Sequence, residues 1–228
     1  MKTSIAVYLE LGKKRVFVAS VEWPGWCRSG RDAESALEAL LEYGPRYAKA
    51  IKSARLGFKV PSHTEAFKIV EKLKGNATTD FGAPGIAPKA DARGLDAKEL
   101  KRQEAILKAC WTALDRAAAK AKGATLSTGP RGGGRSLTKI VAHALDAEGA
   151  YLHALGGKYR GTDAKVMHET VLAMLESRAR GEEPDMSRRK APLWHPRYAV
   201  RRSAWHALDH AWEIEDRAGR GTGRTRRT

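Results

Sequence analysis

Hydrophobic and polar residues first alternate along the chain in the pattern of β-strands. Residues 3–9 (TSIAVYL) and 15–21 (RVFVASV) are rich in β-branched side chains and flank a short turn that contains Gly12. This pattern predicts a β-hairpin. A turn-rich stretch, WPGW at residues 23–26, follows the second strand.

A helical pattern begins near residue 32. Asp32 stands at an N-cap position, and the apolar residues behind it recur at helical spacing on one face: Ala36, Leu37, Leu40 and Leu41. Pro45 must end or kink this helix. Ser62 and Glu65 have the spacing of a capping box, so we predict a second helix from Ser62 to about Lys74.

Glycine and proline separate this first half from a helical second half. Residues 75–95 contain Gly75, Gly82, Pro84, Gly85, Pro88 and Gly94, which indicates an inter-domain linker. Beyond it we predict four helices, over residues 96–122, 136–155, 162–180 and 197–218. Because glycine or proline lies between them, an antiparallel bundle is expected.

The predicted fold class is therefore α+β, with a small hairpin and helix domain before the bundle. We place the first domain at residues 1–74, the linker at 75–95 and the bundle at 96–218. The last residues, 219–228 (GRGTGRTRRT), lack apolar side chains, and we expect a disordered basic tail there.

Composition is that of a globular protein, since 42% of the 228 residues are hydrophobic and 30% are charged. No apolar run approaches the roughly 18–20 residues of a membrane span, and we expect no signal peptide and no membrane partner. Cys27 and Cys110 lie far apart without CxxC spacing, so we expect a reduced, cytoplasmic protein.

A net charge of +16 favours anionic partners, such as nucleic acid, acidic lipid or an anionic small substrate. The basic residues are spread along the whole chain and are densest in the tail. This spread weakens the nucleic-acid interpretation without excluding it, because a solvated tail explains the same pattern.

Histidines in two of the predicted helices indicate a metal site. His206 and His210 stand four residues apart, so both imidazoles lie on one helical face. His143, in the middle of helix 136–155 beside an apolar face, offers a third nitrogen. A three-histidine site leaves one coordination position open for water or substrate. Periodicity alone leaves open the alternative that these histidines lie on the surface.

The last helix also carries a second apolar face. In helical projection Trp205, Leu208 and Trp212 lie roughly 150° from the histidine pair. If the histidine face lines the bundle interior, the tryptophan face must be covered by the N-terminal domain or by a second subunit.

Two segments of the second half resemble the DinB/YfiT-like superfamily of metal-binding four-helix bundles. They are SLTKIVAHALDAE at residues 136–148 and RRSAWHALDHAWEI at residues 201–214. The resemblance extends over about 130 residues and implies that His143, His206 and His210 hold a divalent metal. Zinc or nickel is the implied ion, with manganese or iron as further candidates.

Other titratable residues are candidates for chemistry near this site. Glu148, beyond His143, could orient a ligand, act as a base, or form a structural salt bridge. His168 projects onto an apolar helix face and is either a pocket acid/base or a core histidine. We expect His153 and His63 at the surface, and His195 near the pocket entrance.

Residues 21–41 (VEWPGWCRSGRDAESALEALL) resemble the HicB-like antitoxin fold, in which a strand, a Pro-Gly turn and a later glycine precede an amphipathic helix. Domains of this kind bind a partner toxin, and an appended module binds DNA. No such module is evident here, which argues against DNA regulation. We expect the domain to cover the tryptophan face of the bundle or to support a homodimer.

Three functions are consistent with these features. The first is a metal-dependent hydrolase or thiol transferase acting on a small, anionic substrate, with Arg197, Arg201 and Arg202 either attracting that substrate or solvated. The second is a non-catalytic, metal- and partner-binding stress protein. The third is a basic nucleic-acid-binding protein. Any single reaction drawn from the resemblance would rest on analogy alone.

Overall fold

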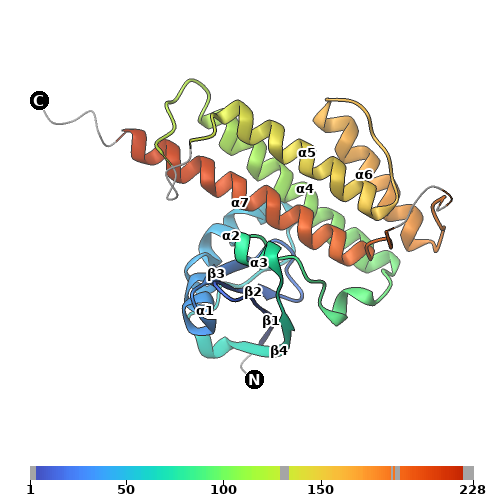
Figure 1. Cartoon of the computed structure of the whole chain (residues 1–228), viewed down its shortest axis with the longest axis horizontal. Coiled ribbons are helices and arrows are strands. Elements are labelled where there is room, and N and C mark those ends of the chain that lie inside the picture. Colours follow the sequence, from blue (N-terminus) through green and yellow to red (C-terminus); the bar gives the residue numbers. More distant parts are fainter. Residues whose placement is uncertain (1–3, 129–133, 186, 188–190, 223–228) are drawn as a thin grey trace, which may run out of the picture.

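The α+β fold class is confirmed by the computed structural model, which describes residues 4–128, 134–185, 187 and 191–222. A four-stranded sheet with short helices packs beneath a group of long helices (Figure 1). The first half of the chain forms the sheet unit, and the second half forms the helices.

The predicted hairpin is confirmed as β1 (Ile5–Leu11) and β2 (Val16–Ser20), which pair antiparallel. Two further strands complete the sheet in the order β3-β2-β1-β4. Strand β3 (Cys27–Gly30) pairs antiparallel with β2, and β4 (Phe67–Lys74) pairs parallel with β1. The sequence did not predict β3, which follows a turn-rich stretch.

The predicted helix from Ser62 to Lys74 is wrong, because most of this segment is β4. Of the two predicted capping-box residues, only Glu65 lies in a helical turn, the short 3-10 turn Thr64–Ala66, whose N-cap is His63. Beyond it, Phe67–Lys74 pairs with the edge of β1 that β2 leaves open. An open edge offers unpaired backbone N–H and C=O groups, and pairing with them outweighs a weak local preference for helix.

The first helix is confirmed as α1 (Ala33–Glu42), and the Asp32 side chain accepts a hydrogen bond from the Ser35 N–H. Pro45 lies in the first turn of the next helix, α2 (Gly44–Ala50). Further 3-10 turns are Lys52–Ala54 and Lys89–Ala92. The helix α3 (Ala77–Phe81) lies within the predicted linker.

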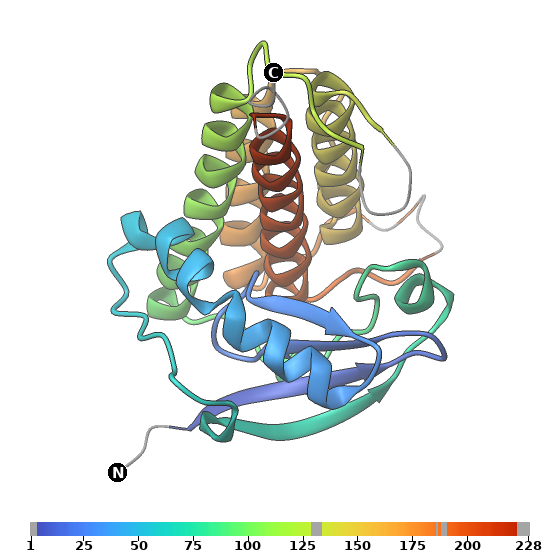
Figure 2. The same ribbon diagram turned by 90° about the vertical axis from the view of Figure 1, so that its left-hand side faces the viewer.

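The four predicted helices of the second half are confirmed. They are α4 (Ala97–Lys120), α5 (Leu137–Leu155), α6 (Ala164–Ala179) and α7 (Pro196–Thr222). The predicted disordered tail is wrong for residues 219–222, which belong to α7, and its remainder, residues 223–228, lies outside the described residues. Asp96 and Ser136 cap α4 and α5 with their side chains, as expected. Figure 2 shows the four helices side by side, with α7 lying against the sheet unit. No described helix is long and apolar enough to cross a bilayer.

Residues 75–95 are packed against both halves of the chain. The buried carboxylate of Glu10, on β1, accepts hydrogen bonds from the backbone N–H groups of Gly85 and Ile86. Further along the segment, the carboxylate of Asp91 is paired with Arg201 of α7. The predicted linker is therefore held by contacts with both halves of the chain.

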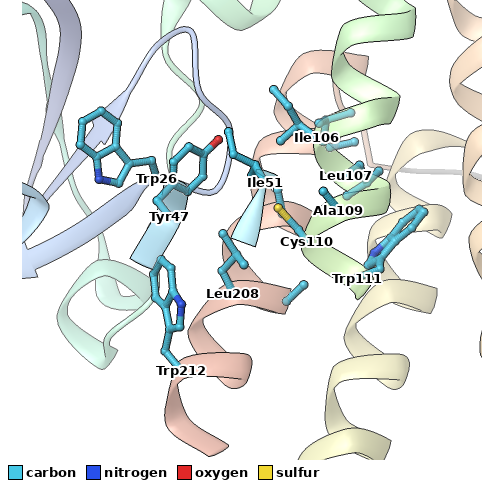
Figure 3. Packing of buried hydrophobic residues seen from close by; sticks show 14 of the residues in the cluster. Trp26, Tyr47, Ile51, Ile106, Leu107, Ala109, Cys110, Trp111, Leu208 and Trp212 are labelled. Atoms are coloured by element: carbon cyan, nitrogen blue, oxygen red, sulfur yellow. The ribbon is translucent and has the colours of Figure 1, made fainter. Parts of the chain in front are cut away.

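One buried hydrophobic cluster joins the sheet unit to the helices. Trp26 and Tyr47 stack in the sheet unit, and Ile106 and Leu107 of α4 and Leu208 of α7 belong to the same cluster (Figure 3). Burial of this surface on both sides holds the two halves together.

The sheet unit covers the tryptophan face of α7. Trp205 packs edge-on against Phe17 of β2, with ring centroids 6.2 Å apart. Trp212 packs in the same manner against Tyr43, at 5.0 Å. The sequence left open whether the N-terminal domain or a second subunit covers this face. In the structure, the N-terminal part of the same chain covers it.

Candidate metal centre

Two helices bring the three predicted histidines together. His206 and His210 lie on α7 and His143 lies on α5, and one ring nitrogen of each lies within 4.8 Å of the others. The side chains of His206 and His210 are buried, whereas His143 is partly exposed. The cluster is therefore shielded on the α7 side and open to solvent beside His143.

The donor set fits a cation. The Nε2 atoms of His206 and His210 are 3.1 Å apart, and the three rings are steeply inclined to one another. Two nitrogen lone pairs at this distance repel unless a proton or a metal ion lies between them. Two ligands of a tetrahedral zinc ion would be separated by about 3.3 Å, a similar spacing. The three nitrogens could hold a divalent metal ion.

An acidic side chain orients one of the three rings. The Nδ1 of His210 lies 2.8 Å from Glu213 Oε2, and Arg217 donates a hydrogen bond to Glu213 Oε1 at 2.8 Å. The ionised carboxylate accepts a hydrogen bond from the Nδ1–H of His210, and in this tautomer the Nε2 lone pair is directed at the cluster. Arg217 in turn donates to the carbonyls of Ser127 and Arg135, so the loop before α5 is tied to this network.

The surroundings of His206 and His143 favour the neutral form of these two candidate ligands. Burial, followed by the neighbouring His210 and His143, lowers the pKa of His206. Burial, followed by the charge of Arg135, lowers the pKa of His143. The hydrogen bond from His210 lowers the pKa of Glu213. Neutral imidazoles and an ionised carboxylate are the states that a metal centre requires.

Replacing Glu213 by glutamine is expected to weaken metal binding roughly 10–100-fold, the usual effect of losing an outer-shell carboxylate. The amide cannot stabilise the His210 Nδ1–H with a negative charge. Competition with a metallochromic chelator measures the affinity. Glu215, which lies on the same helix and pairs with Arg46, supplies the control variant Glu215→Gln. Equal affinities for wild type and both variants would contradict a positioning role for Glu213.

Glu148 lies outside the histidine cluster, in a buried polar layer to which every long helix contributes one side chain. The Ser203 hydroxyl, on α7, donates to the Glu148 carboxyl at 2.6 Å. The Trp111 Nε1–H, on α4, donates to the same carboxyl at 3.4 Å. His168, on α6, stacks on the Trp111 ring at a centroid distance of 3.9 Å. A small apolar cavity adjoins the layer and is lined by Glu148, Tyr151 and Ser203 among others.

Burial raises the pKa of Glu148 to about 7, above that of an exposed glutamate. Burial also lowers the pKa of His168 to about 4, so this imidazole is neutral at physiological pH. The layer thus combines a carboxyl that titrates near neutrality with a neutral histidine. Both residues were predicted as candidates for acid/base chemistry, and neither is among the three clustered ligands.

The raised pKa of Glu148 predicts a pH-dependent stability. The neutral carboxyl is favoured in the folded state, so its contribution is complete below the unfolded pKa and is lost as pH rises through about 7. A shift of this size corresponds to about 3 kcal/mol. Glu148→Gln cannot titrate, so urea unfolding should show its stability relative to wild type improving by that amount from about pH 4 to pH 8. The exposed Glu183→Gln should show no such trend, and a flat difference for Glu148→Gln would contradict the prediction.

The remaining predicted residues lie away from the cluster. His63 and His153 are exposed, as expected. His195 is also exposed and borders a surface pocket between the start of α4 and the end of α6, and none of the three clustered histidines lines that pocket.

The three arginines of α7 that were considered as substrate-attracting or solvated, namely Arg197, Arg201 and Arg202, are all buried, so none of them is solvated. Arg197 pairs with Glu99, and Arg201 pairs with Asp91. These two connect α7 to its neighbours. Arg202 instead lies near the histidine cluster, where its Nη2 donates to the Tyr151 hydroxyl at 3.2 Å.

Sequence reasoning missed Glu213, Arg217 and Tyr151. Glu213 follows His210 by three residues and Arg217 follows Glu213 by four, so helical spacing alone places all of them along one face. Tyr151 carries no such signal, since it reaches His206 only through the packing of α5 on α7.

Comparisons with the models of known protein families, with curated proteins and with solved structures find no match to this chain.

Proposed function

We propose that the protein is a metal-dependent enzyme, either a hydrolase or a thiol transferase, that acts on a small substrate at the three-histidine cluster. The observation that carries the proposal is the convergence of His143, His206 and His210, with their nitrogens within 4.8 Å of one another. A protein that held the metal only as a structural element would be expected to supply a fourth ligand. No fourth histidine, cysteine or carboxylate joins this cluster among the residues that the structure describes.

The proposed metal is a divalent ion, with zinc or nickel favoured by three imidazole ligands and manganese or iron as further candidates. When bound, it would supply Lewis acidity for hydrolysis or a binding position for a thiolate. Side chains of the protein would orient the ligands and limit the access of water. Glu213 orients His210, and burial of His206 and His210 excludes water from the α7 side. The partly exposed His143 marks the side from which a substrate would enter.

The resemblance of residues 136–148 and 201–214 to DinB/YfiT-like bundles is consistent with this proposal, since its implied ligands are the clustered residues. We further propose that the HicB-like N-terminal part serves this bundle as a cover. Its contacts with Trp205 and Trp212 of α7 support that role. A cover of this kind needs neither a partner toxin nor a second subunit.

The test is the metal content of protein purified without chelators, together with turnover of small esters, amides and thiol conjugates. We expect about one divalent ion per chain and turnover that disappears on chelation and returns on reloading. Bound metal without turnover of any of these substrates would favour the non-catalytic alternative. Protein that neither retains nor takes up a divalent ion would contradict the proposal outright.

Nucleic-acid binding is the weaker candidate. Part of the basic charge is internal, because Arg197, Arg201, Arg202 and Arg217 are buried and bonded within the fold. Those side chains are not available to phosphates on a nucleic-acid surface. Salt-sensitive retention on immobilised DNA would be the result that favours this candidate over an enzyme.

A further inference from the structure

Arg202 is a buried cation next to the candidate metal centre. It precedes His206 by one helical turn on α7, and only 8% of its surface is exposed. Its Nη1 donates to the carbonyl of Pro84, and its Nη2 donates to the Tyr151 hydroxyl. Both partners are neutral, so neither hydrogen bond balances the positive charge.

The other buried arginines of α7 all have acidic partners. Arg197 pairs with Glu99, Arg201 with Asp91, and Arg217 with Glu213. Among the residues that the structure describes, no carboxylate lies at salt-bridge distance from Arg202. A buried charge without a counter-charge is costly. We therefore take the buried Arg202 guanidinium as a sign that a positive charge has a function at this position.

The guanidinium is held in a defined place. It lies over the ring of Trp205, at 4.9 Å, and over that of Tyr151, at 5.4 Å. The Tyr151 ring in turn packs edge-on against His206, with centroids 5.8 Å apart. One aromatic ring therefore contacts both the cation and a candidate metal ligand.

The guanidinium also retains donors for a ligand. An arginine has five N–H groups in a planar fork, and the two bonds to Pro84 and Tyr151 engage one on each terminal nitrogen. A carboxylate matches such a fork because its two oxygens can accept parallel hydrogen bonds. Arg202 lies about 6 Å along the helix axis from His206, a separation that a chain of a few bonds can span.

We propose that Arg202, supported by the Tyr151 hydroxyl, binds the carboxylate of a small substrate whose reacting group lies at the three-histidine centre. This inference rests on the proposed function and narrows its substrate class to molecules that carry a carboxylate a few bonds from a thiol or a hydrolysable group. In this arrangement the substrate carboxylate is the counter-charge of the Arg202 guanidinium, whose hydrogen-bond partners within the described residues are neutral.

Two thiols of equal length test the proposal, namely 3-mercaptopropionate and its neutral counterpart 3-mercaptopropionamide. The full-length protein is loaded with Co²⁺, and each thiol is titrated while the visible absorption of the ion is followed. Wild type should bind the carboxylate on the order of tenfold more tightly than the amide, the usual range for a charge-assisted hydrogen bond. Arg202→Met should remove this preference, so that the two thiols bind with similar affinity.

Further variants separate recognition from folding and from a diffuse electrostatic field. Tyr151→Phe keeps the ring and removes the hydroxyl, so it should reduce the preference even if Arg202→Met fails to fold. Arg135 is exposed and also acts electrostatically on His143, and Arg135→Met should retain the preference. A preference lost equally in Arg135→Met, or absent in wild type that binds both thiols, would overturn the carboxylate site and leave the metal centre standing. Absence of any Co²⁺ binding would overturn the proposed function as well.

Discussion

Replacing His206 by alanine is expected to abolish metal binding at the site. His206 is one of three clustered ligands, its side chain is buried, and its Nε2 lies 3.1 Å from that of His210. The two histidines left behind would form only a bidentate site. The loss of affinity should therefore exceed the roughly 10–100-fold expected for an outer-shell residue. Elemental analysis of protein purified without chelators, and titration with Zn²⁺ or Ni²⁺, measure the effect.

The matched control is His63→Ala, which removes an exposed histidine of the sheet unit. It should retain the metal content of wild type. A second readout is thermal stability, because a ligand that binds only the folded state at 100 times its dissociation constant adds about 2.7 kcal/mol. Added metal should raise the melting temperature of wild type and His63→Ala but not of His206→Ala. An equal rise in all three would place the metal elsewhere.

Removing the carboxylate of Asp91 is expected to destabilise the fold by about 3–5 kcal/mol, because it leaves the buried Arg201 unpaired. Asp91 is 1% exposed and binds the guanidinium through both oxygens, at 2.7 and 2.8 Å. The same guanidinium donates to the carbonyls of Ser20 and Val21 at the end of β2. One ion pair thus connects α7, the sheet and the segment that joins the two halves.

Urea unfolding of Asp91→Ala measures this cost. The comparison variant is Glu182→Ala, which breaks an exposed ion pair with Arg180 and should leave the unfolding midpoint near that of wild type. If the two variants unfold at the same urea concentration, the Asp91–Arg201 pair does not stabilise the junction. A lower cooperativity in Asp91→Ala alone would show that the halves unfold separately without it.

Much of the helical architecture was predictable because its signals are local. Asp32, Asp96 and Ser136 cap the helices that they were expected to begin. A capping side chain binds a backbone N–H two or three residues away, so sequence neighbours alone specify it. The predicted hairpin is local in the same sense, since a short turn joins its strands.

Strand β4 was not predictable by these means. Its partner is β1, which lies about 60 residues earlier in the chain. The local sequence from Ser62 to Lys74 carries a helix-start pattern, and no residue within it reports that an open sheet edge is near. Strand β3 was missed for a different reason, because it contains only four residues and directly follows a turn-rich stretch.

The candidate metal centre was likewise predictable only where its signals are local. The sequence by itself determined that His206 and His210 share a face of one helix, and it determined the opposite tryptophan face, because helical periodicity is a property of neighbouring residues. Only the tertiary structure decided that α5 brings His143 to that pair and that the sheet unit covers the tryptophans. It also decided that Arg202 is buried and has no acidic partner within the described part of the chain, since pairing depends on contacts between distant segments.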